Sequence, residues 1–149
     1  MPSLRAAGPD DHPLVLPWTQ ALNAHEGIDL AEAALAAALA ELLAAPAIGR
    51  VWIIEDAGAA VGYALVTFGY DLEFHGRDAV LTELWLEPAA RGAGVGAAAL
   101  ALLEPQLREL GVHALHLQVR PDNPARRLYE RAGFVASPRV VMTRRLAPG

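Results

Sequence analysis

A glycine-rich turn in the middle of the chain limits its fold more than any other feature. A strand-like run ending Leu84-Trp85-Leu86-Glu87-Pro88 leads into a segment with glycine at every second position, Gly92, Gly94 and Gly96. A helix-forming sequence then continues to about Leu110. This strand–turn–helix order predicts backbone N–H groups that converge, free of side chains, at the positive end of a helix dipole. Such a turn is an anion site, and a pyrophosphate matches it best.

Two other interpretations of the turn stay open on these residues. In one, the glycines serve only a tight turn and close helix packing. In the other, Gly92-x-Gly94-x-x-Ala97 is the loose dinucleotide-binding fingerprint. That fold places the turn after its first strand and an acidic residue about twenty positions later. Here several strand-like segments come first, and the later region reads Leu115-His116-Leu117-Gln118-Val119-Arg120. The dinucleotide interpretation therefore fits poorly.

Hydrophobic periodicity and turn residues predict the order of the other elements. Helical spacing of leucines and strand-like apolar runs alternate with glycine and proline turn signals along the chain. The expected elements are helices at 11–26 and 30–45, strands at 51–54, 61–66 and 79–87, a helix at 94–110, a strand at 114–119, a short helix from Asn123 to Gly133, and a last strand at 140–142. This order predicts an α+β fold with a mixed, mostly antiparallel central sheet flanked by about four helices.

Composition narrows the classes of function. A chain of 149 residues corresponds to a single domain, residues 1–149. The net charge is −5 and no basic block occurs, so we expect neither nucleic acid nor a membrane as partner. Without cysteine there is no thiol nucleophile, disulfide or thiolate metal site. Because the N-terminal residues lack the pattern of a signal peptide, we expect a cytoplasmic location.

Two segments carry a resemblance to a known family. The first is Arg91-x-x-Gly94-x-Gly96 after a strand ending Leu-Trp-Leu-Glu-Pro, which is similar to the acyl-CoA signature of the GNAT superfamily of N-acetyltransferases. The second runs from Leu117-Gln118-Val119 through Asn123 and Leu128-Tyr129-Glu130 to Gly133-Phe134, and it resembles the second signature of that superfamily. Both occur in the family's order, and the expected element order agrees with its fold.

The resemblance implies a cofactor and a way to bind it. The co-substrate would be acetyl-CoA, with no metal ion, and a homodimer is the assembly that the family suggests. The pantetheine arm of acetyl-CoA would pair as a false strand with the backbone of Leu84 and Leu86, where the fourth and fifth strands splay apart. The pyrophosphate would lie on the backbone amides of Arg91, Gly92, Ala93, Gly94, Val95 and Gly96. Asn123 would cap its helix and touch the cofactor, or cap the helix alone.

Transfer of an acetyl group to a primary amine requires a base and an acid. An alkylamine with a pKa of about 10 arrives protonated, and the departing thiolate needs a proton. The resemblance nominates Tyr129 as the acid that meets the thiolate, and a buried core tyrosine is the alternative. Glu83 is the candidate base because strict strand alternation would place it beside Leu81 and Trp85, where burial raises the pKa of a carboxyl group. It resembles the acid of spermidine/spermine-type acetyltransferases, and a surface or salt-bridged carboxylate is the alternative.

The residues that would hold the amine are less defined. Acidic and aromatic side chains in the first two helices and after the third strand are suited to a cation, or are scattered surface groups: Trp18, Asn23, His25, Glu26, Tyr70, Asp71, Glu73 and His75. His113 and His116 lack a third ligand at metal spacing and are interpreted as structural. The sequence thus predicts an N-acetyltransferase that works by direct attack in a ternary complex. A catalytically silent acyl-CoA-binding regulatory module is the alternative.

Overall fold

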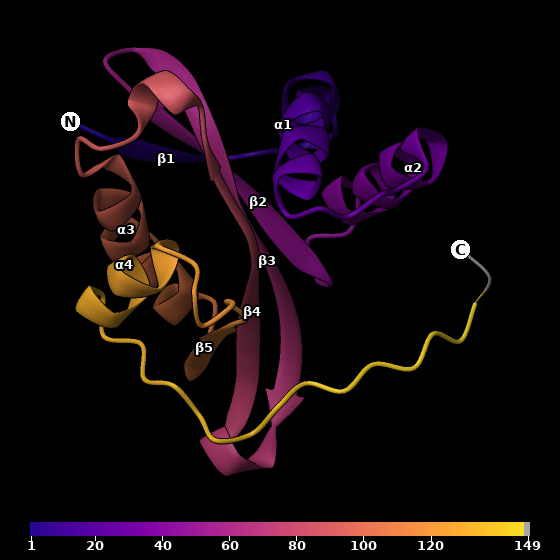
Figure 1. Cartoon of the computed structure of the whole chain (residues 1–149), viewed down its shortest axis with the longest axis vertical. Helices are drawn as coiled ribbons and strands as arrows, with labels where there is room; N and C mark the ends of the chain where they lie inside the picture. The colour runs from indigo at the N-terminus through magenta and orange to yellow at the C-terminus, as the bar shows by residue number, and fades with distance from the viewer. Residues whose placement is uncertain (148–149) are drawn as a thin grey trace.

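Five strands form one sheet in which neighbours in space are also neighbours along the chain, β1-β2-β3-β4-β5. The computed structural model describes residues 1–147 and is drawn in Figure 1. Strands β1 to β4 pair antiparallel, and β5 joins β4 in parallel. The expected mixed, mostly antiparallel sheet is therefore confirmed. The strands are β1 (Ser3–Ala6), β2 (Gly49–Asp56), β3 (Ala59–Asp71), β4 (Gly76–Leu86) and β5 (Ala114–Leu117).

Within the described residues, four α-helices cover the sheet. They are α1 (His12–His25), α2 (Glu32–Leu43), α3 (Val95–Glu109) and α4 (Ala125–Arg131). Figure 1 shows α1 and α2 on one side of the sheet and α3 and α4 on the other. Three short 3-10 turns complete the chain's regular elements in the described residues. Turn η1 (Pro9–Asp11) precedes α1, η2 (Leu72–Phe74) joins β3 to β4, and η3 (Pro88–Ala90) follows β4. None of the helices in residues 1–147 is long and apolar enough to cross a bilayer.

Alternation along the strands divides the apolar side chains between two layers. One layer joins α1 and α2 to the sheet through the buried side chains of Val15, Trp18, Leu39, Leu43, Val51, Ile53, Tyr63 and Leu65. The other layer joins α3 to the opposite face through Trp52, Ile54, Ala64, Val66, Ala79, Leu81, Val95, Ala99, Leu100, Leu103 and Leu107. Each helix pair is thus held by its own core, and the sheet is common to both.

A β-bulge in β4 changes which side chains face which layer. Leu65 of β3 is opposite Glu83, but the next residue, Val66, is opposite Leu81, so Thr82 is the extra residue. Leu81 consequently packs in the α3 layer, whereas Glu83 lies on the face toward α1. The expectation that Leu81 shares a face with Glu83 is therefore wrong, because strict alternation is interrupted between them.

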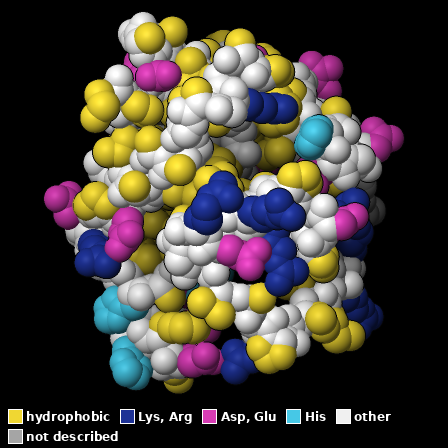
Figure 2. Space-filling model, turned by 60° about the vertical axis from the view of Figure 1, so that its left-hand side comes forward, with side chains coloured by type: hydrophobic (Ala, Val, Ile, Leu, Met, Phe, Trp, Pro, Cys, Tyr) yellow, Lys and Arg dark blue, Asp and Glu magenta, His cyan; other side chains and the backbone are white. Residues whose placement is uncertain are grey.

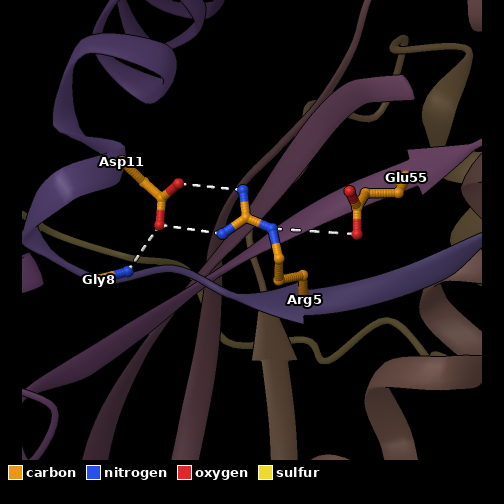
Figure 3. A network of polar contacts seen from close by, with 4 residues as sticks. All are labelled: Arg5, Gly8, Asp11 and Glu55. Atoms are coloured by element: carbon orange, nitrogen blue, oxygen red, sulfur yellow. Dashed lines mark hydrogen bonds and ion pairs between the residues drawn. The ribbon is translucent and has the colours of Figure 1, made fainter. Parts of the chain in front are cut away.

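Strand β1, which the sequence analysis did not predict, is connected to the start of α1 by an ion-pair network (Figure 3). The Arg5 guanidinium lies 3.0 Å from the Asp11 carboxylate and 4.0 Å from that of Glu55 on β2. Asp11 also accepts the N–H of Gly8 at 2.9 Å. The hydrogen bonds from Arg5 and Gly8 hold the pKa of Asp11 below its usual value. The edge strand is thereby fixed against the helix that follows it.

The strand expected at Val140-Val141-Met142 is absent. These residues have no regular secondary structure and pair with no strand in the described part of the chain, and their side chains are exposed. The β-branched sequence favours an extended backbone, but a strand also requires a neighbouring strand, which the sheet does not supply at this position. The other expected elements are present, with small shifts at their ends.

Candidate active site

The turn between β4 and α3 carries a series of unpaired backbone donors. The N–H of Arg91 bonds the Pro88 carbonyl at 3.2 Å and so closes η3. Among residues 1–147 no acceptor is found for the N–H groups of residues 92–97, and the first bond of the helix runs from the Ala98 N–H to the Gly94 carbonyl at 3.0 Å. Gly92 and Gly94 both have a φ of 81°. Left-handed residues alternating along a turn make successive N–H groups converge into a concave anion site.

The Arg91 side chain supports this turn from the strand side. Its Nε donates to the Leu86 carbonyl at 2.9 Å, and its guanidinium lies 4.4 Å from the centroid of the Trp85 ring. Both contacts fold Arg91 back over the end of β4. The role of Arg91 is therefore to hold the turn, while the free backbone donors begin at Gly92.

A gap opens between β4 and β5 directly before the turn. The two strands pair only over Asp78–Leu81 and Ala114–Leu117, and β4 continues to Leu86 without β5 beside it. The Glu87 N–H bonds the Val61 carbonyl on β3 at 2.7 Å. By alternation, the backbone N–H groups of Leu84 and Leu86 point the other way, into the gap. These are the two residues whose backbone the sequence analysis expects to meet a pantetheine arm.

A hollow of about 1460 Å³ extends from α1 past this gap to β5 and α4, and Glu83 and Tyr129 both line it. On the α1 side, the Tyr63 hydroxyl donates to the Glu83 carboxylate at 2.6 Å. Burial raises the pKa of Glu83, and the hydrogen bond from Tyr63 lowers it in part. Burial also raises the pKa of Tyr63 far above its usual value, so this phenol remains a donor. Glu83 is thus neither a surface carboxylate nor part of an ion pair in the described residues.

Tyr129 reaches the same hollow from α4. Burial raises its pKa, and the charge of Glu26 at the end of α1 adds to the effect. Glu26, directly after α1, and Tyr129, on α4, line the same hollow, so this hollow connects the two sides of the sheet. Asn123, also in the lining, accepts the Ala125 N–H at 2.9 Å and so caps α4 as expected.

Aromatic rings close the site on the α1 side. Trp18 stacks on Tyr63 with a centroid distance of 5.9 Å, and its Nε1 donates to the Glu87 carboxylate at 2.6 Å. Trp85 lies next to His25 in an edge arrangement, and its buried Nε1 has no partner within residues 1–147. These contacts fix the face of β4 that carries Glu83.

Some candidate residues lie elsewhere. Tyr70, Asp71, Glu73 and His75 surround η2 at the far end of the β3–β4 hairpin, so they do not join Glu83, whereas Asn23 and Glu26 line the hollow. His113 contacts the Phe74 carbonyl at 3.0 Å, and His116 pairs with Asp78 at 3.2 Å. No group of three potential metal ligands is found in the part of the chain that the structure describes.

Tyr63 is the site residue that the sequence analysis missed. A tyrosine inside an apolar strand is typical of a core position, and Tyr63 is indeed completely buried. Its hydroxyl reaches Glu83 only because the bulge at Thr82 turns Glu83 toward the α1 face. The sequence contains one signal for this contact. Two neighbouring apolar strand segments each carry one polar side chain, Tyr63 and Glu83, and antiparallel pairing of the segments brings the two side chains together.

These features define a class of fold: a mixed sheet with a donor-rich turn at the mouth of a helix, an open strand edge beside that turn, and one hollow that a buried carboxyl group and a phenol both line. Residues 17–134 match the acetyltransferase (GNAT) family. The chain belongs to this family, whose members are acyl-CoA-dependent N-acetyltransferases.

Similar proteins extend the comparison to the whole fold. An integron cassette protein from the mobile metagenome of Cole Harbour salt marsh is 32% identical, with a TM-score of 0.85 over 98% of this chain and 91% of that one. A predicted acetyltransferase from Clostridium acetobutylicum, crystallised with acetyl-CoA, is 22% identical and has a TM-score of 0.80 over 97% and 96%. The latter likeness concerns the fold alone.

One curated relative has a named substrate. The [ribosomal protein bS18]-alanine N-acetyltransferase of Haemophilus influenzae is 44% identical over 57 residues, which are 38% of this chain. The match spans about two fifths, 39%, of that relative's length.

Proposed function

We propose that the protein transfers the acetyl group of acetyl-CoA to a primary amine by direct attack in a ternary complex. The observation that carries this proposal is the alignment of three features along β4: Glu83, the gap-facing backbone at Leu84 and Leu86, and the donor-rich turn from Gly92. A diphosphate on the turn and a pantetheine arm in the gap bring a thioester to the hollow that Glu83 and Tyr129 line. A binding module without catalysis has no use for the buried carboxyl group.

The binding mode follows from the free donors. The N–H groups of Gly92 to Gly96 hold the diphosphate at the mouth of α3, where the helix dipole also favours an anion. Helix α4 contributes Arg126, Arg127 and Arg131. Figure 2, which turns the side of α3 and α4 forward, shows basic side chains gathered in the middle of that face. A cationic surface near the turn favours the remaining phosphate of coenzyme A.

The proton route uses the two groups that flank the gap. Glu83 as the carboxylate accepts a proton from the ammonium group of the acceptor, directly or through a water molecule. The free amine attacks the carbonyl carbon of the thioester, and a gap-facing N–H of Leu84 or Leu86 stabilises the oxyanion. When the C–S bond breaks, the Tyr129 hydroxyl gives its proton to the thiolate, and the nitrogen of the new amide bond gives up its second proton to the Tyr129 phenolate through water. The products are a neutral amide and free CoA, and Glu83 releases the first proton to solvent.

Tyr63 acts through Glu83 as a positioning residue. Its hydroxyl fixes one carboxylate oxygen at 2.6 Å and favours the ionised form that a base requires. The stacking of Trp18 on the Tyr63 ring holds the donor in place. Burial alone would raise the pKa of Glu83 further and leave a smaller fraction of carboxylate at neutral pH.

The experiment that tests this function follows release of CoA from acetyl-CoA with a panel of primary amines. The panel includes a peptide with N-terminal alanine, because the Haemophilus influenzae relative is named for an alanine acceptor. An α-amino group, with a pKa near 8, also loses its proton more readily to Glu83 than a lysine side chain does. Stimulation by at least one amine above acceptor-free hydrolysis supports the proposal. No stimulation by any amine, together with tight acetyl-CoA binding, would favour the binding module.

A further inference from the structure

The hollow contains a second carboxylate, which the proposed acetyl transfer does not use. Glu26, directly after α1, is half-buried and lines the hollow together with Glu83 and Tyr129. Its carboxylate forms no ion pair within residues 1–147. Arg120, which also lines the hollow, donates to the Glu26 carbonyl at 3.4 Å and so contacts its backbone. A partly desolvated carboxylate without a counter-ion favours a cationic ligand.

The surroundings of Glu26 on α1 also accept hydrogen bonds. Asn23 lines the hollow one turn earlier, and its amide nitrogen donates to the Thr19 carbonyl at 2.7 Å, which leaves its amide oxygen as an acceptor. Glu26 is the C-terminal cap of α1, and this end of a helix carries partial negative charge. The exposed side chain of Ile28 adds apolar surface to the lining. This end of the hollow is thus suited to an ammonium or guanidinium group on an apolar chain.

A cation at Glu26 is unsuited to be the reacting amine. That amine must lose a proton to Glu83 before it attacks, and a second carboxylate in contact with it would favour the protonated, unreactive form. Glu26 is nevertheless close to the reaction, because its charge contributes to the raised pKa of Tyr129. A group bound at Glu26 is therefore close enough to belong to the same acceptor molecule, and it can stay charged throughout the transfer.

We propose that Glu26 is a specificity-determining residue that binds a second cationic group of the acceptor, so that the protein prefers amines with two positive charges. This role of Glu26 rests on the proposed acetyl transfer. Two kinds of acceptor have the required chemistry: an aliphatic diamine, and a peptide with a basic side chain next to its free amino terminus. A monoamine lacks one charge-assisted hydrogen bond, which is worth about tenfold in affinity.

The first test compares acceptors that differ in the second charge. One pair is putrescine, a linear diamine, with butylamine, and the other is Ala-Arg amide with Ala-Gln amide. Release of CoA from acetyl-CoA gives kcat/KM for each acceptor. The wild type should prefer the doubly charged member of at least one pair by about tenfold. Added salt should reduce this preference, because it screens the charges.

Two variants decide whether Glu26 causes the preference. Glu26→Gln should use both members of a pair equally. Glu32→Gln, the same change at an exposed residue of α2 outside the hollow, should keep the preference. A wild type without a preference in either pair, or a Glu26→Gln variant with the preference unchanged, would overturn the role of Glu26. A preference in one pair alone supports the role and identifies the acceptor as a diamine or a peptide.

A second measurement does not depend on turnover. The acetylated products of the two dications keep only the second charge, and calorimetry in the presence of CoA measures their binding. N-acetylputrescine should bind the wild type about tenfold more tightly than N-butylacetamide, or N-acetyl-Ala-Arg amide more tightly than N-acetyl-Ala-Gln amide, and Glu26→Gln should bind both members equally. Turnover of amines without this difference in binding would overturn the role of Glu26 alone. The difference in binding without any turnover would support that role and contradict the proposed acetyl transfer.

Discussion

The substitution Gly92→Ala tests whether the turn between β4 and α3 binds the cofactor. Its cost in backbone strain should appear in the affinity for acetyl-CoA and not in the stability of the fold. Gly92 has a φ of 81°, and no atom lies within 4 Å of an added Cβ, so only the backbone conformation penalises the change. A left-handed alanine costs about 1–2 kcal/mol. In the described part of the chain, the N–H groups of Gly92 and of the next residues have no hydrogen-bond partner, so the free turn can relax. We therefore expect the free energy of unfolding to change little. Binding of acetyl-CoA should be weaker by the same 1–2 kcal/mol, because the turn must return to its left-handed conformation to bind.

The result should be an acetyl-CoA dissociation constant about 5- to 30-fold higher, which is what 1–2 kcal/mol amounts to. The matched control is Gly111→Ala. Gly111 has a φ of 77° and equally open space, but its N–H and that of Val112 bond the end of α3 at 3.0 Å each. That turn cannot relax, so the same cost should appear as lost stability with unchanged affinity. Titration calorimetry and thermal melting measure the two quantities. Equal affinity losses in both variants, or none in Gly92→Ala, would refute the assignment of the turn.

The remaining predictions concern the acid–base groups. Glu83→Gln should reduce turnover by about 10²–10⁴-fold, the usual contribution of a general base, while acetyl-CoA affinity in calorimetry stays the same; near-normal turnover would remove Glu83 as base. Tyr129→Phe should lower turnover in the CoA-release assay far more than acetyl-CoA affinity, and an unchanged rate would leave Tyr129 as a core residue only. Tyr63→Phe removes the hydrogen bond that lowers the pKa of Glu83, so the acidic limb of the kcat/KM–pH profile should move to higher pH while the plateau is kept. A uniform loss at all pH values would instead indicate a merely structural role.

Local sequence signals predicted the turn, the element order and the mixed sheet, because each depends on neighbours along the chain. Gly92, Gly94 and Gly96 marked the turn, and Asn123 marked the start of α4. The face of Glu83 could be predicted only in part. Strict alternation grouped it with Leu81, and the bulge at Thr82 separates them.

Other features depend on contacts between distant segments, and no local pattern contains them. The hydrogen bond from Tyr63 to Glu83 joins positions 20 residues apart, and the influence of Glu26 on Tyr129 joins α1 to α4. Residues 140–142 show the converse. Their β-branched sequence predicted a strand, but a strand also needs a neighbouring strand, and none pairs with them within residues 1–147.

A crystal structure of the protein with acetyl-CoA bound would test the proposed site directly. We expect the diphosphate within hydrogen-bonding distance of the N–H groups of Gly92 to Gly96, the pantetheine arm along Leu84 and Leu86, and the thioester between Glu83 and Tyr129. Acetyl-CoA bound at another surface, with this turn unoccupied, would contradict the proposed site and every role assigned to its neighbours.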